Sequence, residues 1–211
     1  FLSIKLIFLS FQLKYVLTMK IFITGGSGFI GSHVVAKLLA RKHELLLLSR
    51  GSRHSNRRDF VGAAFIRGDL ENIRTWEKLV KRFRPDAVMH FAWEGLASHD
   101  YGSKTSARNL KNTLNLISFA AEVECKKFLS AGSSWEYGAV NGKLKEEEPF
   151  KSPPHVPSFV FAKRKILSEG IRIAQECGMQ FLWPRLFFVY GPGQRPASLI
   201  PHLIRSFKER V

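Results

Sequence analysis

The chain has 211 residues, 45% of them hydrophobic, so it can bury one full core and part of a second. Its 33 Lys and Arg residues outnumber 17 Asp and Glu residues, which gives a formal net charge of +16 at pH 7. The basic residues are dispersed, with no basic helix carrying interleaved aromatics, which argues against nucleic-acid binding as the main role. Cys125 and Cys177 form no CxxC pair. This argues against a disulfide framework or a zinc site and favours a reducing, cytoplasmic location.

Residues 1–18 are apolar but are interrupted by Lys5, Gln12 and Lys14. A membrane-spanning helix needs about 20 mostly apolar residues, and a secretory signal needs a basic start and a small-residue cleavage site. Neither pattern is clean, and the first Met, Met19, directly precedes a strand-like run. We therefore expect residues 1–18 to be an upstream extension, or a start-site artefact, outside the fold, without a membrane span. A weak membrane anchor is the alternative.

Residues 19–40 read as a strand, a glycine turn and a helix. The run 21–24 is apolar enough for a strand buried on both faces of a parallel sheet. Three glycines follow at three-residue intervals, and apolar residues then recur at helical spacing. Such a turn lets the backbone approach a pyrophosphate, and the helix N-terminus offers unpaired N–H groups and a positive dipole end. The predicted dinucleotide contacts are Gly25, Gly28, Phe29, Ile30 and Gly31.

The glycine pattern in TGGSGFIG is TGxxGxxG, not the GxGxxG of the ordinary dinucleotide fingerprint. It resembles the short-chain dehydrogenase/reductase superfamily, and most closely its extended branch of sugar-nucleotide epimerases, dehydratases and reductases. The resemblance implies an α/β fold of Rossmann type, a doubly wound parallel sheet with helices on both faces. It also implies an NAD(P)-binding domain over residues 19–190, with residues 191–211 as the start of a substrate-binding lobe that is largely missing.

A second buried strand, 44–48, ends at Ser49, Arg50 and Gly51. In dinucleotide folds an acidic residue here binds the adenosine ribose 2′-hydroxyl, whereas a basic one accommodates a 2′-phosphate. Ser49 fills the acidic position, and Arg50 and Arg53 follow. The pattern favours NADP over NAD through Arg50. A solvated basic loop is the alternative.

Two further strands, 63–67 and 87–93, are predicted to complete the cofactor site. The first ends in Gly-Asp-Leu, and in the resembled family such a turn brackets the adenine. The second ends in HFAW, similar to the family's HLAA, whose small residues let the ribose and diphosphate lie against the backbone. His90 in this pattern is interpreted as structural. The resemblance thus assigns five more residues to the cofactor: Asp69, Leu70, Phe91, Ala92 and Trp93.

After a helix over 103–122, the fifth strand, 127–130, leads into AGSSWEYG. Enzymes of the resembled superfamily use a Ser or Thr here and a Tyr-x-x-x-Lys on the next helix. The Tyr protonates the reduced carbonyl, the Lys lowers the pKa of the Tyr, and the Ser bonds the substrate oxygen. Counting back from Tyr137 places the Ser at Ser133. The 4,6-dehydratases carry Asp-Glu next, where this chain has Ser134 and Trp135, which disfavours dehydration.

The helix over 158–169 carries the Lys of the Tyr-x-x-x-Lys motif but not the Tyr. Ala162-Lys163 matches the family's pair and puts Phe159 where the Tyr belongs; with Lys165 as the Lys, that residue is Phe161. Loss of a positioned general acid costs about a hundred- to ten-thousand-fold in rate. The chain is therefore impaired, inactive, or dependent on Ser133 or a water for the proton. The assigned catalytic residues are Ser133, Ser134 and Lys163, and Lys163 is also expected to hold the nicotinamide ribose.

A sixth strand, 179–183, leads to RLFFVYGPG, where Phe188 replaces the Asn of the family's RxxNVYGPG. Together with HFAW, AGSSWEYG and GKLKEEEP, this segment is most similar to the 4-ketoreductases that make deoxyhexoses for surface polysaccharides.

The motifs therefore predict an NADP- (or NAD-) dependent oxidoreductase or epimerase acting on a nucleoside-diphosphate sugar, with 4-keto reduction favoured. A truncated dinucleotide-binding protein without catalysis is the alternative. In relatives the two helices before Ser133 and after Phe159 form the dimer face, so the resemblance implies a homodimer if the fold is complete.

Overall fold

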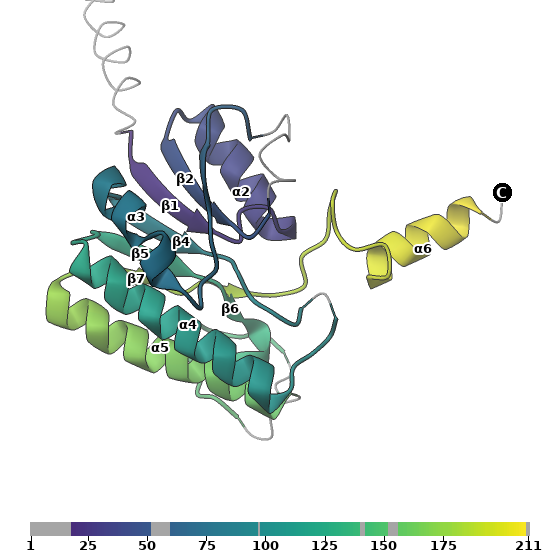
Figure 1. Cartoon of the computed structure of the whole chain (residues 1–211). Coiled ribbons are helices and arrows are strands. Elements are labelled where there is room, and N and C mark those ends of the chain that lie inside the picture. Colours follow the sequence, from purple (N-terminus) through teal and green to yellow (C-terminus); the bar gives the residue numbers. More distant parts are fainter. Residues whose placement is uncertain (1–17, 52–59, 97, 140–141, 152–155, 210–211) are drawn as a thin grey trace, which may run out of the picture.

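The computed structural model describes residues 18–51, 60–96, 98–139, 142–151 and 156–209. The predicted extension 1–18, except Thr18, and Arg53 lie outside the described residues. At the centre is a parallel six-stranded sheet in the order β3-β2-β1-β4-β5-β7 (Figure 1). Its strands are β1 (Lys20–Thr24), β2 (Glu44–Ser49), β3 (Ala64–Arg67), β4 (Ala87–His90), β5 (Lys127–Ser130) and β7 (Gln180–Leu182). Because β1 is central and the chain winds outward from it in both directions, the predicted doubly wound sheet is confirmed.

A second, two-stranded parallel sheet joins β6 (Gly132–Ser133) to β8 (Arg185–Leu186). The described helices are α2 (Phe29–Ala40), η3 (Ile73–Thr75), α3 (Glu77–Phe83), α4 (Ser103–Glu122), η4 (Ser134–Tyr137), α5 (Pro157–Cys177) and α6 (Leu199–Lys208). Helix α5 is longer than the sequence predicts and ends at Gly178, whose φ of 69° lies in the left-handed region. None of the described helices is both long and apolar enough to cross a bilayer.

Helices cover both faces of the sheet, because apolar side chains alternate between the two faces along each strand. On β1, Phe22 belongs to the core formed with α3, α4 and α5, whereas Ile21 and Ile23 belong to the core formed with α2. Trp76 is fully buried in the first core, with its ring 5.4 Å from that of Phe22. Helices α4 and α5 lie side by side across this face (Figure 1).

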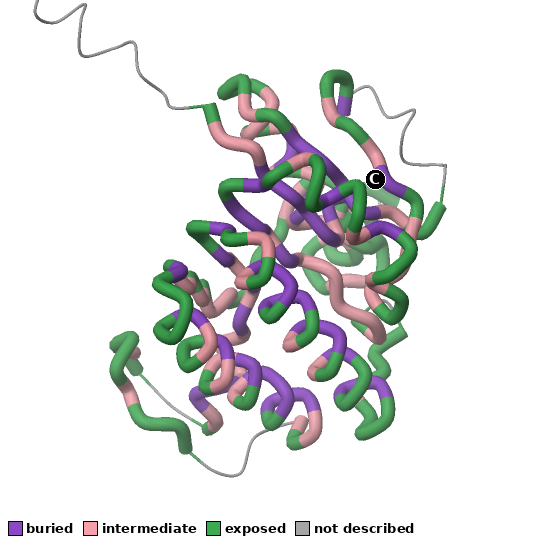
Figure 2. Tube along the Cα trace, turned by 60° about the vertical axis from the view of Figure 1, so that its left-hand side comes forward, coloured by how far each residue is buried: buried purple, intermediate pink, exposed green. Residues whose placement is uncertain are grey.

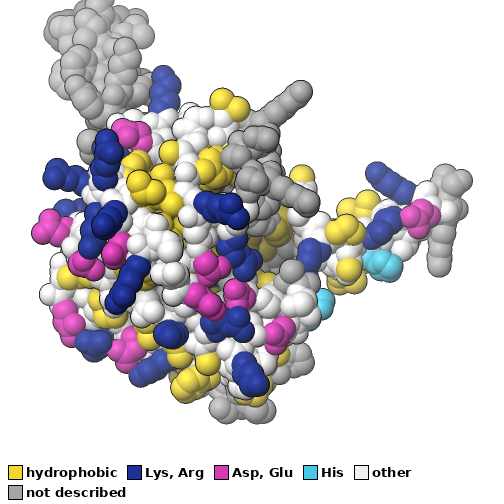
Figure 3. Space-filling model, viewed as in Figure 1, with side chains coloured by type: hydrophobic (Ala, Val, Ile, Leu, Met, Phe, Trp, Pro, Cys, Tyr) yellow, Lys and Arg dark blue, Asp and Glu magenta, His cyan; other side chains and the backbone are white. Residues whose placement is uncertain are grey.

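Burial is concentrated in the sheet and the inward faces of its helices, and α6 has no buried residue (Figure 2). Helix α6 projects away from the body of the molecule, and its hydrophobic side chains are visible on its surface (Figure 3).

The central strands end together at one edge of the sheet. Thr24 of β1 pairs in register with His90 of β4, which pairs in turn with Ser130 of β5. Since β1 and β4 flank the point where the strand order reverses, this edge is where ligands bind in open α/β sheets.

Candidate functional site

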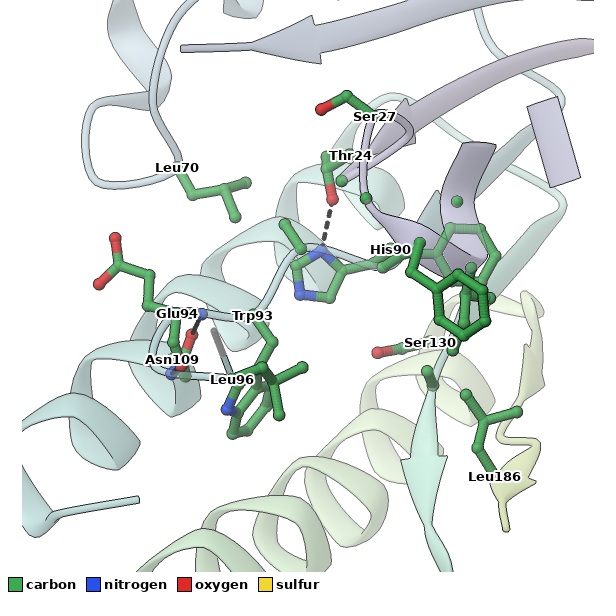
Figure 4. Close-up of a pocket in the computed structure, with 18 of the residues that line it drawn as sticks. Thr24, Ser27, Leu70, His90, Trp93, Glu94, Leu96, Asn109, Ser130 and Leu186 are labelled. Atoms are coloured by element: carbon green, nitrogen blue, oxygen red, sulfur yellow. Dashed lines mark hydrogen bonds between the residues drawn. The ribbon is translucent and has the colours of Figure 1, made fainter. Parts of the chain in front are cut away.

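A cavity of about 670 Å³ opens over the carboxyl ends of β1, β4 and β5 (Figure 4). Its volume lies within the range of small-molecule sites, about 300–1,000 Å³. Segments far apart in the chain meet there, from the glycine turn after β1 to helix α5. The residues assigned from the sequence that line it are Gly25, Gly28, Phe29, Ile30, Gly31, Arg50, Asp69, Leu70, Phe91, Ala92, Trp93, Ser133 and Lys163. Ser134 does not line it.

The glycine turn packs backbone against backbone. Gly25 has a φ of 71°, and a Cβ there would collide with the backbone of Phe91 and Ala92. A Cβ on Gly31 would collide with the carbonyl oxygen of Gly25, which accepts the N–H of Gly28 at 3.0 Å. Helix α2 begins immediately afterwards with no acidic residue in its first turn. The positive end of α2 therefore faces the cavity across the glycine turn. This turn forms a cradle that side chains at Gly25 or Gly31 would fill, and such a cradle fits a dinucleotide pyrophosphate.

Arg50 stands at the end of β2, between two carboxylates. Its Nη1 lies 3.2 Å from Glu94 Oε1, and its Nε lies 4.0 Å from Asp69 Oδ2. Arg108 also reaches Glu94, with Nη1 3.5 Å from Oε2. The Arg50 side chain is 71% exposed and lines the cavity. A ribose 2′-phosphate bound here would contact the Arg50 guanidinium. It would compete for it with the carboxylates of Asp69 and Glu94.

Asn109 of α4 fixes the segment that follows β4. Its Nδ2 donates to the carbonyl oxygen of Glu94 at 3.0 Å, and its Oδ1 accepts the Glu94 N–H at 2.9 Å (Figure 4). Asn109 is not among the site residues assigned from the sequence. These two hydrogen bonds to the backbone of Glu94 explain how α4 holds Glu94 against the cavity.

His90 is enclosed by two threonines at the end of β4. Its Nδ1 lies 2.6 Å from Thr24 Oγ1 (Figure 4). Its Nε2 lies 2.9 Å from Thr113 Oγ1. Thr113 Oγ1 donates to the Asn109 carbonyl, so it accepts from Nε2–H, and Thr24 donates to Nδ1. Burial, together with the nearby charge of Lys163, lowers the pKa of His90 to about 3. A neutral imidazole with both nitrogens occupied supports the structural interpretation of His90.

Ser133 is held rigidly at the cavity wall. Its N–H donates to Glu136 Oε1 at 2.6 Å, and its Oγ accepts the Trp135 N–H at 3.2 Å. Glu136 is wholly buried, with Oε2 lying 3.4 Å from Arg185 Nε. Because Ser133 caps the short turn η4 in this way, the chain leaves the sheet edge at Ser134. This is why the structure places Ser133, but not Ser134, in the cavity.

Lys163 of α5 is buried and lines the cavity. Its Nζ donates to the Ala131 carbonyl oxygen at 2.7 Å and lies 3.6 Å from the centroid of the Trp93 ring. Burial lowers the pKa of Lys163 to about 7, while the negative charge of Glu136 opposes that shift. The amine therefore titrates near neutral pH, unlike an exposed lysine.

Of the two phenylalanines that the sequence suggests in place of the Tyr, only Phe159 faces the cavity. Phe159 is 4% exposed and lines the cavity, whereas Phe161 is 66% exposed. The Phe159 ring lies 5.2, 5.4 and 5.6 Å from the rings of Trp93, Tyr101 and Trp135. The residue that faces the cavity one turn before Lys163 therefore carries no hydroxyl.

Sequence reasoning missed the contribution of the segment after β8. It noted the RLFFVYGPG motif but assigned none of these residues to the site. The cavity residues from β8 and this segment are Leu186, Val189, Gly193, Gln194, Arg195 and Ser198. His33 Nε2 lies 2.8 Å from the Pro192 carbonyl oxygen and so connects the segment to α2.

The chain is similar in sequence and fold to several sugar-nucleotide enzymes. A bifunctional UDP-glucose and UDP-xylose 4-epimerase of Pisum sativum is 33% identical over 72% of this chain and 46% of its own length. A dTDP-glucose 4,6-dehydratase of Actinoplanes sp. is 29% identical over 87% and 61%, respectively. The crystal structure of UDP-glucose 4-epimerase from Thermotoga maritima with UDP-glucose matches with a TM-score of 0.70 and 28% identity, over 85% of this chain and 59% of that one.

The chain thus spans between 46% and 61% of the length of these relatives. A family model described as the NAD dependent epimerase/dehydratase family matches residues 21–211. This match covers the sheet from Ile21 onward, the glycine cradle and the cavity, and it confirms the resemblance seen in the sequence. The protein belongs to the NAD-dependent epimerase/dehydratase family.

Proposed function

We propose that the protein is an NAD(P)-dependent oxidoreductase or epimerase of a nucleoside-diphosphate sugar, with reduction of a 4-keto group as its favoured reaction. One observation carries the proposal: a single cavity joins a glycine cradle suited to a dinucleotide to Ser133 and Lys163. The relatives described above support it, since their names specify UDP- and dTDP-sugars.

The cofactor would lie across the carboxyl ends of the strands. When bound there, it would supply the hydride for the sugar carbonyl. The α2 N-terminus and the glycine cradle would hold its pyrophosphate. Asp69 and Leu70 would bracket the adenine, and Lys163 would hold the nicotinamide ribose. Arg50 favours NADP, because its guanidinium is the cationic group at the end of β2.

Ser133 would orient the sugar carbonyl. Its Oγ already accepts the Trp135 N–H, which leaves its own hydrogen available for the carbonyl oxygen. The capping contacts with Glu136 hold it in place before substrate arrives, and such preorganisation is what makes a donor effective in the transition state. Positive charge on Lys163 would stabilise the oxygen as negative charge develops on it.

The distribution of carboxylates favours keto reduction over dehydration. Among the described residues that line the cavity, the carboxylates are Asp69 and Glu94, both beside Arg50 at the adenosine end. Glu136 is engaged with Arg185 beneath Ser133. Elimination of water needs a base and an acid beside the sugar, and no carboxylate stands there in the described part of the chain.

A second candidate is a dinucleotide-binding protein without turnover. Phe159 favours it, because the residue facing the cavity one turn before Lys163 cannot donate a proton. The two candidates share the cofactor site and differ only in the chemistry at Ser133 and Lys163.

The proposed assembly is a homodimer through α4 and α5, in the cytoplasm. Phe161 and Ile171 give α5 exposed apolar surface outside the cavity. Light scattering of the wild type and of Phe161→Glu tests this, since a charge in an apolar interface would shift the population to monomers.

The deciding experiment measures binding and turnover separately. NADPH and NADH binding is followed by calorimetry, and oxidation of each is followed optically with a dTDP-4-keto-6-deoxysugar. The proposal predicts oxidation only in the presence of the keto sugar, and a faster rate for Phe159→Tyr. Binding without oxidation in either protein would establish the second candidate, and absence of binding would exclude both.

A further inference from the structure

The site lacks an obvious proton donor. This inference rests on the proposed function, in which a sugar ketone becomes an alcohol and its oxygen must gain a proton as its carbon gains a hydride. Phe159 faces the cavity one turn before Lys163 and has no proton to give. The proton must therefore come from another group in the cavity or from water.

The other titratable groups near this end of the cavity are poorly placed. His90 has both ring nitrogens bonded to threonines and stays neutral, since burial lowers its pKa to about 3. Tyr101 contacts Phe159 ring to ring at 5.4 Å but does not line the cavity. The lining carboxylates, Asp69 and Glu94, stand with Arg50 at the adenosine end.

Lys163 meets the geometric requirements. It lines the same cavity as Ser133, on the same helix as Phe159 and one turn further on. Its Nζ is bonded to the carbonyl of Ala131, two residues before Ser133 on the adjoining strand end. We propose that the Lys163 ammonium itself protonates the sugar carbonyl oxygen that Ser133 orients.

The step balances without a further reactant. As the hydride reaches the carbonyl carbon, the π electrons of the C=O bond move to oxygen. That oxygen forms an O–H bond with a proton from Lys163 Nζ, the N–H bond breaks, and its electrons stay on nitrogen. Lys163 is left as a neutral amine, and water restores its proton after product leaves.

The surroundings suit an amine that alternates between charged and neutral forms. The rings of Trp93, Phe159 and Trp183 lie 3.6, 5.6 and 5.7 Å from Nζ and provide an apolar wall. The Ala131 carbonyl accepts a hydrogen bond from either form. Burial lowers the pKa of Lys163 to about 7, and a general acid is most effective when its pKa lies near the working pH.

The charged groups packed around Lys163 allow this titration. From η4, Glu136 favours the ammonium, but its carboxylate is shared with Arg185 of β8 and Trp183. From β4, His90 is neutral. On α5 itself, Arg164 donates to the backbone carbonyl of Glu136 and not to its carboxylate. The nearby charges therefore do not hold Lys163 permanently in the ammonium form.

The test compares the pH dependence of NADPH-driven keto-sugar reduction in wild type, Lys163→Arg, Tyr101→Phe and Phe159→Tyr. Wild-type turnover should be constant below about pH 7 and fall about tenfold per pH unit above it, because the ammonium is lost. Lys163→Arg should lose at least about a hundredfold and show no break near neutral pH. Lys165→Arg, on the exposed side of the same helix, is the matched control and should match wild type.

Two further measurements separate this role from a structural one. The Nζ resonance of isotope-labelled lysine, identified by its loss in Lys163→Arg, should titrate near pH 7 in the protein without cofactor. In a Phe159→Tyr background the phenol supplies the proton, so Lys163→Arg should cost less than it does in wild type. Cofactor affinity measured in parallel accounts for any loss of ribose binding.

A wild type that reduces the keto sugar with a flat pH profile would overturn the role of Lys163 and leave the proposed function standing. A break near neutral pH that persists in Lys163→Arg and disappears in Tyr101→Phe would assign the proton to Tyr101. If wild type and Phe159→Tyr both bind NADPH without reducing any keto sugar, the proposed function itself fails.

Discussion

The Nζ of Lys163 lies 3.6 Å from the centroid of the Trp93 ring, closer than to any other ring recorded around it. The two residues come from α5 and from the segment after β4. Their contact joins the end of the central sheet to the helix that carries the site's amine. The indole attracts the cation and at the same time excludes water from it, and these two effects move the pKa of Lys163 in opposite directions.

Replacing Trp93 with Ala should raise the pKa of Lys163 above about 7. Desolvation is the largest cause of the present shift, which corresponds to roughly 5 kcal/mol at 1.36 kcal/mol per pH unit. A cation–π contact is worth about 2 kcal/mol when desolvated, so access of water should outweigh its loss. The lysine Nζ resonance measures the change, with Trp93→Phe as the control that retains a ring. An unchanged or lower pKa would show that the indole acts mainly through its attraction for the cation.

Gly25→Ala should destabilise the protein and abolish cofactor binding. The φ of 71° and the backbone of Ala92 leave no room for a Cβ, so the turn must open. A residue forced into such a conformation costs of order 1–3 kcal/mol. Urea unfolding and calorimetric titration with NADPH measure the two effects. Gly51→Ala, where a Cβ meets no atom within 4 Å, is the control for stability. Normal NADPH affinity in Gly25→Ala would contradict the cradle as the pyrophosphate site.

Arg50→Ser should weaken NADPH binding about tenfold and leave NADH binding nearly unchanged. One charge-assisted contact at an exposed position is lost, and tenfold corresponds to about 1.4 kcal/mol. Glu94→Gln should strengthen NADPH binding, because it removes a carboxylate that lies 3.2 Å from the guanidinium. Arg74→Ser, exposed on η3, controls for the general loss of positive charge. Equal losses of NADPH and NADH affinity in Arg50→Ser would contradict the NADP preference.

Glu136→Ala should cost about 3–5 kcal/mol in the free energy of unfolding, because Arg185 is left without its buried partner. Turnover should fall as well, since Ser133 loses the acceptor of its N–H. Glu136→Gln can still accept that hydrogen bond and should lose less turnover. Glu147→Ala, on an exposed loop, is the control in the same urea series. Full turnover in a folded Glu136→Ala would show that the position of Ser133 does not depend on Glu136.

Stability should rise with pH above neutrality because of Lys163. Its folded pKa of about 7 lies below the ordinary lysine value of 10.5, so between these values the unfolded chain binds more protons than the native protein. The free energy of unfolding therefore increases with pH, by at most about 1.4 kcal/mol per pH unit. Lys163→Met should remove this slope, whereas Lys165→Met should keep it. Urea unfolding at several values above about pH 7 measures both slopes.

The order of local patterns along the chain determined the fold and the glycine cradle. Continuous apolar runs predicted the central strands, since strands buried on both faces of a parallel sheet need them. Gly25, Gly28 and Gly31 predicted the cradle, because close backbone contact excludes a Cβ wherever such a turn forms. These features depend on residues that are near neighbours in sequence, and the structure places them as expected.

Tertiary structure alone decided which side chains share the cavity. Phe159 and Phe161 are equivalent in sequence, and only the packing of α5 against the sheet turns one inward and the other to solvent. Arg50 follows β2 and Glu94 follows β4. These two residues pair only because the sheet brings the ends of strands that are distant in sequence close together. The neutral-range pKa of Lys163 likewise arises from burial against Trp93, 70 residues earlier in the chain. Desolvation depends on everything that surrounds a group in space, and no local stretch of sequence contains that information.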